Sequence, residues 1–126
     1  MECTELSPAG NFEAWEPQRR KELESGHFTS NIGQELLHEG EHTRLWLVKL
    51  GYKQRLGFRN ISSSFKVMSQ TDGFAVSYQG SGKIVLIEFK KADMQRHEVV
   101  DEQERIWDLE NIGAETLEFI IIEYLF

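Results

Sequence analysis

The sequence predicts an all-β fold, an antiparallel sandwich or barrel, preceded by one short N-terminal helix. From about Gln34 onward the chain consists of short runs rich in Val, Ile, Phe, Trp and Tyr, separated by glycine-containing turns. Eight such runs at close spacing are typical of antiparallel barrels and sandwiches rather than of alternating strands and helices. The 126 residues are enough for one domain.

The N-terminal region, residues 1–30, is predicted to be an extension that contains the helix. Pro17 is followed by strong helix formers as far as Glu24, and Gly26 comes next. Proline at the first helical position and glycine beyond the last are typical of the two ends of a helix. Phe12 and Trp15 precede the helix, and we expect them to attach it to the rest of the protein.

The body of the protein, residues 31–126, contains the predicted strands. These are Thr43–Leu50, Lys53–Arg59, Ser63–Ser69, Phe74–Tyr78, Ile84–Phe89, Gln95–Val100, Arg105–Leu109 and Leu117–Leu125. Asp72-Gly73 and the segment Gln79–Gly82 have turn sequences and are expected to join neighbouring strands.

The last predicted strand is apolar on both faces. Phe119–Ile122 are four consecutive apolar residues, whereas a half-exposed strand would alternate apolar and polar side chains. We expect one face to lie in the core of the barrel and the other to be covered by a second sheet or a partner subunit. A homodimer is therefore expected.

The charge and the apolar runs exclude two classes of partner. The chain has 14 basic and 21 acidic residues, a net charge of −7, so it lacks the basic surface that binds nucleic acid. Its longest apolar run, Phe119–Ile122, is far too short to cross a bilayer. Cys3 has no internal disulfide partner, and residues 1–10 do not resemble a signal peptide. We expect a soluble, cytoplasmic protein with no nucleic-acid or membrane partner.

His38, Glu39 and His42 match the zinc-peptidase pattern H-E-x-x-H. That chemistry requires a helix, because only there do positions i and i+4 face the same way. Gly40 in the middle costs a helix about 1 kcal/mol, and the segment leads directly into the strand that begins at Thr43. A charged turn between two strands is the interpretation we favour, with a metallopeptidase as an alternative of a different functional class.

His97 lies within the predicted strand Gln95–Val100. A histidine in a strand either forms a hydrogen bond with a neighbouring group or contributes to the mouth of a pocket, and the sequence leaves both interpretations open. The acidic segment Asp101–Arg105 that follows is predicted to be a solvated loop.

Several stretches resemble small single-domain cupins. Residues 31–46 contain the pair Leu36-Leu37, an acidic turn and an Arg-x-Trp run that ends at Trp46, similar to the first strand of those proteins. Residues 108–113 and 117–125 look like the closing strands of the same family, and Ala92-Asp93 stands where the family has a Gly-Asp turn. The similarity is greatest to small cupins linked to β-alanine degradation. It implies a cupin-like jelly-roll β-barrel over residues 31–126, in agreement with the predicted strands.

The resemblance also implies metal-ligand positions, and this chain departs from the family at each of them. Arg59 and Ile61 stand where the family has two histidines, and Trp107 stands where it has the last histidine. The glutamate position falls near Phe65 or Lys66. None of these side chains is an ordinary ligand for Fe, Mn, Ni or Zn. We therefore expect no metal and no other cofactor at the family site.

These substitutions imply a barrel interior with apolar and aromatic walls. Its candidate residues are Arg59, Ile61, Phe65, His97, Arg105 and Trp107. Two alternatives are open: the apolar side chains fill the interior as core, or a pocket remains. In the pocket, the forked guanidinium of Arg59 would bind an anionic group such as the carboxylate of a small organic acid.

The function that follows is that of a non-catalytic, cupin-like protein without the usual metal site, which binds a small anionic ligand in the barrel. The alternative is a metal-dependent cupin enzyme with a relocated metal site that uses His97, His38 or His42.

Overall fold

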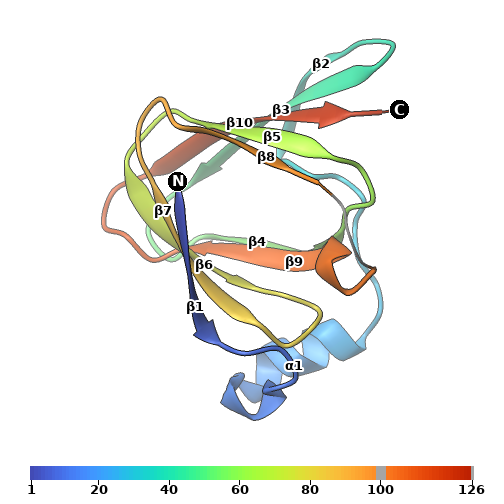
Figure 1. Ribbon diagram of the computed structural model, residues 1–126, viewed down its shortest axis with the longest axis vertical. Coiled ribbons are helices and arrows are strands. Elements are labelled where there is room, and N and C mark those ends of the chain that lie inside the picture. Colours follow the sequence, from blue (N-terminus) through green and yellow to red (C-terminus); the bar gives the residue numbers. More distant parts are fainter. Residues whose placement is uncertain (99–101, 126) are drawn as a thin grey trace.

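Two five-stranded antiparallel sheets face each other in the computed structural model, which describes residues 1–98 and 102–125 (Figure 1). Sheet A has the spatial order β1-β7-β6-β9-β4, and sheet B has the order β2-β3-β10-β5-β8. Strands distant in sequence are neighbours in both sheets; β10, for example, lies between β3 and β5. The all-β prediction is confirmed.

The elements have the following bounds. Sheet A contains β1 (Glu2–Ser7), β4 (Arg55–Asn60), β6 (Gly73–Tyr78), β7 (Ile84–Phe89) and β9 (Ile106–Asn111). Sheet B contains β2 (Glu35–Glu39), β3 (Thr43–Leu50), β5 (Phe65–Ser69), β8 (Met94–His97) and β10 (Leu117–Tyr124). Helix α1 (Pro17–Glu24) and the 3-10 turns η1 (Phe12–Ala14) and η2 (Glu102–Arg105) lie outside the sheets. None of the helices in the described ranges is long and apolar enough to cross a membrane.

The eight predicted strands correspond to β3–β10, and the predicted helix corresponds to α1. Residues 99–100 of the predicted sixth strand, and the first residue of the predicted loop after it, lie outside the described residues. The structure adds β1 and β2, which are not among the eight predicted strands. Both are edge strands whose residues, apart from Ser7, are exposed, so neither carries the alternating apolar pattern that identifies a strand in a sequence.

The core lies between the two sheets, as the burial pattern of β10 shows. Its residues alternate strictly between buried and partly exposed, because successive side chains of a strand point to opposite faces. Leu117, Phe119 and Ile121 are at most 3% exposed and face sheet A. Phe119 stacks on Phe89 of β7 with ring centroids 5.3 Å apart, which joins the two sheets directly.

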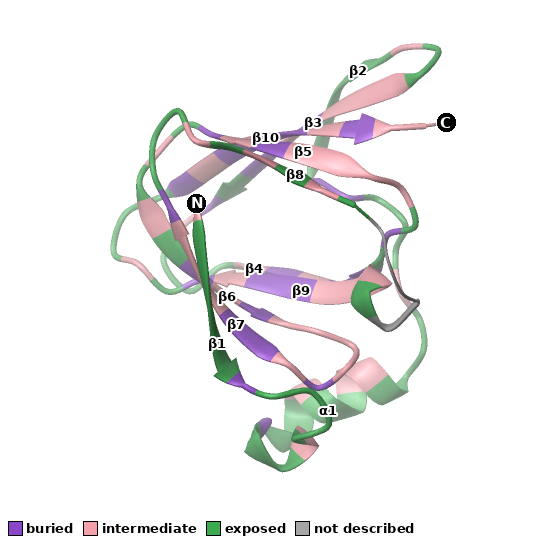
Figure 2. Ribbon diagram, viewed as in Figure 1, coloured by how far each residue is buried: buried purple, intermediate pink, exposed green. Residues whose placement is uncertain are grey.

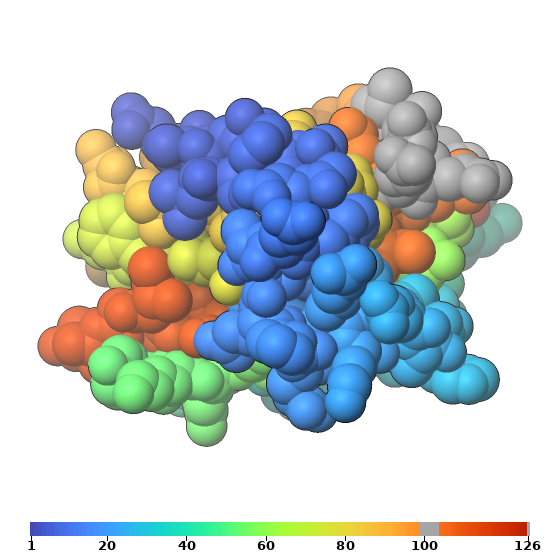
Figure 3. All heavy atoms as spheres, turned by 90° about the horizontal axis from the view of Figure 1, so that it is seen from below, coloured from blue at the N-terminus to red at the C-terminus, as the bar shows by residue number. Residues whose placement is uncertain are grey.

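The N-terminal segment covers the outer face of sheet A (Figures 1 and 3). Trp15 is 5% exposed and stacks parallel to Phe58 of β4, with ring centroids 5.9 Å apart. Its indole Nε1 donates a hydrogen bond to the carbonyl oxygen of Gly82, 2.9 Å away, in the β6–β7 turn. Phe12 packs against Trp15 at 5.3 Å. The predicted attachment of this segment through Phe12 and Trp15 is confirmed.

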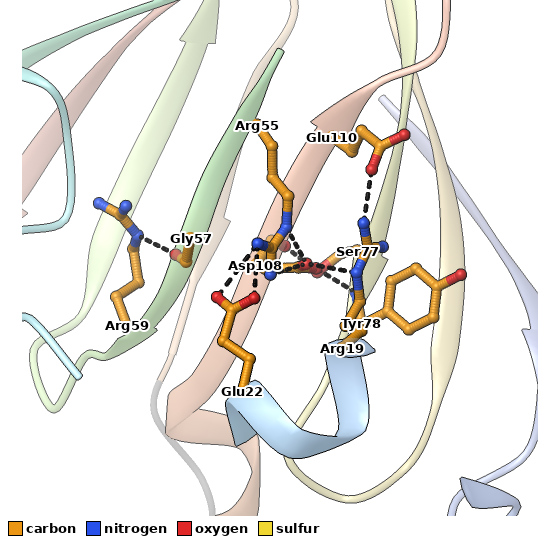
Figure 4. A network of polar contacts seen from close by, with 9 residues as sticks. All are labelled: Arg19, Glu22, Arg55, Gly57, Arg59, Ser77, Tyr78, Asp108 and Glu110. Atoms are coloured by element: carbon orange, nitrogen blue, oxygen red, sulfur yellow. Dashed lines mark hydrogen bonds and ion pairs between the residues drawn. The ribbon is translucent and has the colours of Figure 1, made fainter. Parts of the chain in front are cut away.

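A cluster of charges around the buried Asp108 holds α1 against this face (Figure 4). The Asp108 side chain on β9 is fully buried, and its Oδ2 lies 2.8 Å from both Nε and Nη2 of Arg55 on β4. Its Oδ1 accepts a hydrogen bond from the Tyr78 backbone N–H at 2.7 Å. Arg55 also donates to Glu22 of α1 at 2.8 Å, and Arg19 Nε of α1 lies 3.6 Å from Asp108. Burial raises the pKa of Asp108, while Tyr78 N–H and the two arginines oppose that rise.

Candidate functional site

A cavity of about 400 Å³ lies between the two sheets. Sheet A contributes side chains from β1, β7, β6 and β9, and sheet B contributes side chains from β5, β8 and β10. Its apolar walls include Ile61, Val67, Val85, Leu109, Phe119 and Ile121. A volume in this range is typical of sites for small organic ligands.

Strand pairing explains why β5 and β8 supply one wall. Phe65 is paired with His97, and Val67 is paired with Gln95, in an antiparallel register. Directly paired residues point to the same face, and i and i+2 residues do so along each strand. All four side chains therefore face sheet A and line the cavity.

Aromatic rings form part of this wall. Phe65 stacks on the imidazole of His97, with ring centroids 4.9 Å apart and an interplanar angle of 18°. Trp107 of β9, on the facing sheet, lies 6.1 Å from Phe65 between ring centroids, with an interplanar angle of 34°. Burial lowers the pKa of His97 below its ordinary value of 6.5, so the imidazole is neutral at neutral pH. These rings make this part of the lining aromatic and uncharged, which suits an apolar or aromatic group of a ligand.

The lining also carries polar side chains, and those of Gln95 and Lys83 are available to a ligand. The side-chain oxygen Oε1 of Gln95 is buried without a hydrogen-bond partner among the described residues. A buried acceptor of this kind costs roughly 1–3 kcal/mol unless a donor is supplied. Lys83, from the β6–β7 turn, is the cationic side chain on the lining, and its Nζ lies 3.7 Å from Glu5.

Two carboxylates also reach the lining, those of Glu98 and Glu104. Glu98 accepts hydrogen bonds from Arg96 at 2.5 Å and from Ser64 at 3.0 Å, so its charge is already compensated. These contacts lower the pKa of Glu98.

Four of the six predicted pocket residues line this one cavity: Ile61, Phe65, His97 and Trp107. Ile61 belongs to the hydrophobic core, and Phe65 and Trp107 pack against it. The same side chains are thus both packed in the core and exposed to the cavity.

The other two, Arg59 and Arg105, are not on the lining. Arg59 is 6% exposed, and its guanidinium donates to the carbonyl oxygens of Gly57 at 3.0 Å and Asn31 at 2.7 Å. Figure 4 shows this side chain directed away from the Arg55–Asp108 cluster. Burial is the main reason that the pKa of Arg59 is lowered. The expected role of Arg59 as the anion-binding group has no support in this geometry, because a β-bulge between Leu56 and Arg59 changes the register of β4.

The metal positions implied by the resemblance do not fit a metal. Ile61 and Trp107 present hydrocarbon to the cavity, and Arg59 is a cation bonded to two carbonyl oxygens. Within residues 1–98 and 102–125, no group of three or more His, Cys, Asp or Glu side chains is arranged to hold a metal ion.

The H-E-x-x-H segment forms the β2–β3 hairpin. His38 and Glu39 end β2, and the Gly40 N–H donates to the carbonyl oxygen of Thr43 at 2.8 Å to close the turn. The prediction of a charged turn between two strands is confirmed. β2 and β8 are opposite edges of sheet B, so four strand spacings of about 4.8 Å place His38 roughly 19 Å from His97. These histidines are not brought together.

The sequence analysis missed Gln95 and Lys83. Gln95 lies two residues before His97 on the same strand, so the period-2 rule would have placed both on one face. No local signal identified Lys83, because its position depends on where the β6–β7 hairpin meets the cavity.

A second hollow, of about 350 Å³, is polar and lies beside the start of β3 and the end of β10. Glu123 is 5% exposed there and accepts hydrogen bonds from Trp46 Nε1 at 3.0 Å and Ser63 Oγ at 2.6 Å. Arg44 Nε lies 3.5 Å from the same carboxylate. The charges of this hollow balance each other within the protein, which is typical of a structural cluster.

Solved structures show what this arrangement of sheets resembles. A cupin domain from Bordetella pertussis Tohama I superposes with a TM-score of 0.62 at 12% identity, over 78% of this chain and 96% of that one. A Klebsiella pneumoniae protein with a double-stranded β-helix domain superposes with a TM-score of 0.57 at 14% identity, over 82% of this chain and 86% of that one. A cupin family protein from Methanocaldococcus jannaschii superposes with a TM-score of 0.56 at 14% identity, over 79% of this chain and 87% of that one.

No protein-family model matches the chain, and no curated protein matches it in sequence. At these identities the likeness concerns the fold alone. The chain has the cupin fold, a double-stranded β-helix of two antiparallel sheets with one short N-terminal helix, as the sequence predicted.

Proposed function

We propose that this cupin-fold protein is a non-catalytic binding protein whose barrel cavity holds a small organic acid with a flat, apolar body. The cavity carries this proposal: it is of ligand size, its walls are mainly hydrocarbon and aromatic, and a few polar groups face it. The ring of the ligand would lie against Phe65, His97 and Trp107. We also propose a cytoplasmic location.

The proposal assigns the anionic group of the ligand to Lys83 rather than to Arg59. Lys83 lines the cavity, and its contact with Glu5 at 3.7 Å is too long for a hydrogen bond. A hydroxyl or N–H group elsewhere on the ligand would donate to Gln95 Oε1 and remove the cost of that unpaired acceptor.

Binding of two matched probes tests the proposal. The probes are 2-naphthoate and 2-naphthalenemethanol, which share the ring system and differ in charge. We expect both to shift the NMR signals of cavity residues, and Trp107→Ala to weaken both. Lys83→Gln should weaken only the naphthoate, by about fivefold, because a partly exposed ion pair contributes at most about 1 kcal/mol.

Lys53→Gln is the control, since this exposed lysine lies outside the cavity lining. Absence of signal changes in cavity residues at millimolar concentrations of both probes would contradict the proposal. If Lys83→Gln weakens the binding of both probes equally, Lys83 does not bind the anionic group and is removed from the proposal.

A further inference from the structure

The polar hollow at the end of the barrel has no part in the proposed function. It has a volume of about 350 Å³ and shares no lining residue with the cavity between the sheets. Its floor includes Glu123, which lies on the same inward face of β10 as Phe119 and Ile121. Figure 2 shows that β10 is still buried near its C-terminal end, although the tip of the β2–β3 hairpin beside it is exposed. The hollow is therefore a separate depression in which polar side chains replace the apolar core.

The walls of the hollow come from four segments, and backbone hydrogen bonds hold these segments together. The Asn60 N–H at the end of β4 donates to the carbonyl oxygen of Thr29 at 3.0 Å. The Tyr124 N–H at the end of β10 donates to the carbonyl oxygen of Ser64 at 2.9 Å, and β10 is paired with β3 along its whole length. The walls are thus formed in advance, so a ligand does not have to order them on binding.

The two charges that face the hollow cancel each other. Glu123 is 5% exposed, and its two oxygens already accept hydrogen bonds from Trp46 and Ser63. Arg44 Nε lies 3.5 Å from this carboxylate. A charged ligand would find no unpaired opposite charge here, and the ammonium group of a zwitterion would find the carboxylate already occupied. The hollow therefore favours an uncharged ligand.

The rim of the hollow supplies polar groups that are free to bind such a ligand. Ser30, Asn60 and Ser62 are exposed, and no hydrogen bond joins their side chains to another described residue. Hydroxyl and amide side chains both donate and accept hydrogen bonds, and so do the hydroxyl groups of a ligand. Tyr124 and Leu125 add apolar surface for C–H groups. This combination suits a ligand that carries several hydroxyl groups on a carbon ring.

We propose that the polar hollow binds a neutral saccharide, either a free sugar or the end of a glycan. Its hydroxyl groups would form hydrogen bonds with Asn60, Ser62 and the terminal nitrogens of Arg44. The Arg44 side chain is 33% exposed, and its terminal nitrogens have no hydrogen bond within the described chain. A saccharide can bind these groups without separating Arg44 from Glu123. The site is independent of the barrel cavity and of its ligand.

The three tryptophans make a site-specific test possible, because each reports on a different part of the molecule. Trp46 donates to Glu123 at the floor of the hollow, Trp107 lines the cavity, and Trp15 anchors the N-terminal segment. Their indole N–H signals are followed by NMR during titration with D-glucose, D-galactose and D-mannose up to about 50 mM, a range that covers weak sites. We expect at least one sugar to shift the Trp46 signal and to leave the Trp107 and Trp15 signals unchanged. 2-Naphthoate should shift Trp107 and leave Trp46 unchanged.

Two variants at the rim test the assigned contacts. Asn60→Ala and Ser62→Ala should each weaken binding of that sugar about three- to tenfold, because each removes one hydrogen bond. Thr116→Val is the matched control, since it removes an exposed hydroxyl group in the β9–β10 loop outside the lining. It should leave binding unchanged. Unchanged indole signals of the free variants confirm that they are folded.

Charged analogues test the ligand class. The uronic acid and the amino sugar that correspond to the bound sugar should bind more weakly, because the hollow has no unpaired charge. Binding of the methyl glycoside assigns the site to glycan ends, and its failure to bind assigns the site to free sugars. The proposal is overturned if no sugar shifts Trp46 at the highest concentration, or if neither rim variant weakens the binding. Tighter binding of the zwitterion L-alanine than of any sugar also overturns it.

Discussion

At the scale of single residues, the buried carboxylate of Asp108 limits most strongly which side chains can replace its neighbours. Its side chain has no solvent exposure, and Arg55, Arg19 and the Tyr78 N–H surround the carboxylate. Buried ion pairs of this kind add little net stability but are costly to break, because the remaining charge has neither water nor a partner. The cluster therefore fixes the position of α1 on sheet A more than it stabilises the fold.

Arg55→Met is expected to lower the free energy of unfolding by about 3 kcal/mol. Arg20→Met, which removes an exposed pair with Glu24 on the same helix, should cost less than about 0.5 kcal/mol. Urea unfolding at neutral pH measures both.

The pH dependence of the Arg55→Met variant provides a second readout. The folded-state pKa of Asp108 is already raised and rises further without Arg55, so the folded protein holds the proton more tightly than the unfolded chain. The penalty of Arg55→Met should therefore shrink as the pH is lowered toward the ordinary range of Asp. A pH-independent penalty would contradict the assigned cause.

The resemblance to cupins singled out Ile61 and Trp107 as residues at histidine positions, and both line the cavity. The metal-free interior inferred from them stays a prediction. Arg59 shows the limit of this reasoning, because a bulge in β4 sets the direction of its side chain. Gly57 lies within the bulged stretch and is a local signal for it that the sequence analysis did not use.

At the scale of elements, local sequence and structure agree where turns are short. The β6–β7 hairpin spans Gln79–Lys83, with the Gln79 N–H donating to the Lys83 carbonyl oxygen at 2.9 Å. Gly82 has φ +97° in this turn, and its carbonyl oxygen accepts the hydrogen bond from Trp15. The predicted hairpin is confirmed, and it also anchors the N-terminal segment.

Gly82→Ala is expected to destabilise the protein more than Gly26→Ala, by about 1 kcal/mol or more beyond the shared cost of positive φ. A Cβ at Gly82 would lie 2.8 Å from the Gly10 backbone nitrogen, whereas at Gly26, with φ +71°, nothing lies within 4 Å. Thermal unfolding of the two variants measures the difference. Equal losses of stability in the two variants would mean that the N-terminal segment moves away from residue 82 without a cost in free energy.

The whole molecule has two outer faces of different character and a cavity between its sheets. The N-terminal segment covers one face, and the other presents Ile120, Ile122 and their neighbours without cover in the described chain. Some side chains belong to both the cavity lining and the hydrophobic core. Whether the interior is open or filled therefore depends on the distance between the two sheets.

Filling the cavity tests that distinction. Val67→Phe places a larger side chain on the lining, and we expect binding of 2-naphthoate to fall at least about tenfold with a stability change under roughly 1.5 kcal/mol. Val76→Phe, on β6 but outside the cavity lining, is a control for the larger side chain. A loss of more than about 3 kcal/mol for Val67→Phe would indicate a filled core instead of an open cavity.

The sequence by itself determined the fold class, the single helix with its anchor at Trp15, and the eight strands that carry apolar patterns. These features are local: periodicity, turn residues and helix-end signals lie within a few residues of one another. The tertiary structure alone decided the pairing of edge strands β1 and β2, the direction of Arg59, and the approach of Lys83 to the same cavity as the β8 side chains. Each depends on contacts between segments far apart in the chain, and no local pattern encodes how two sheets are placed relative to each other.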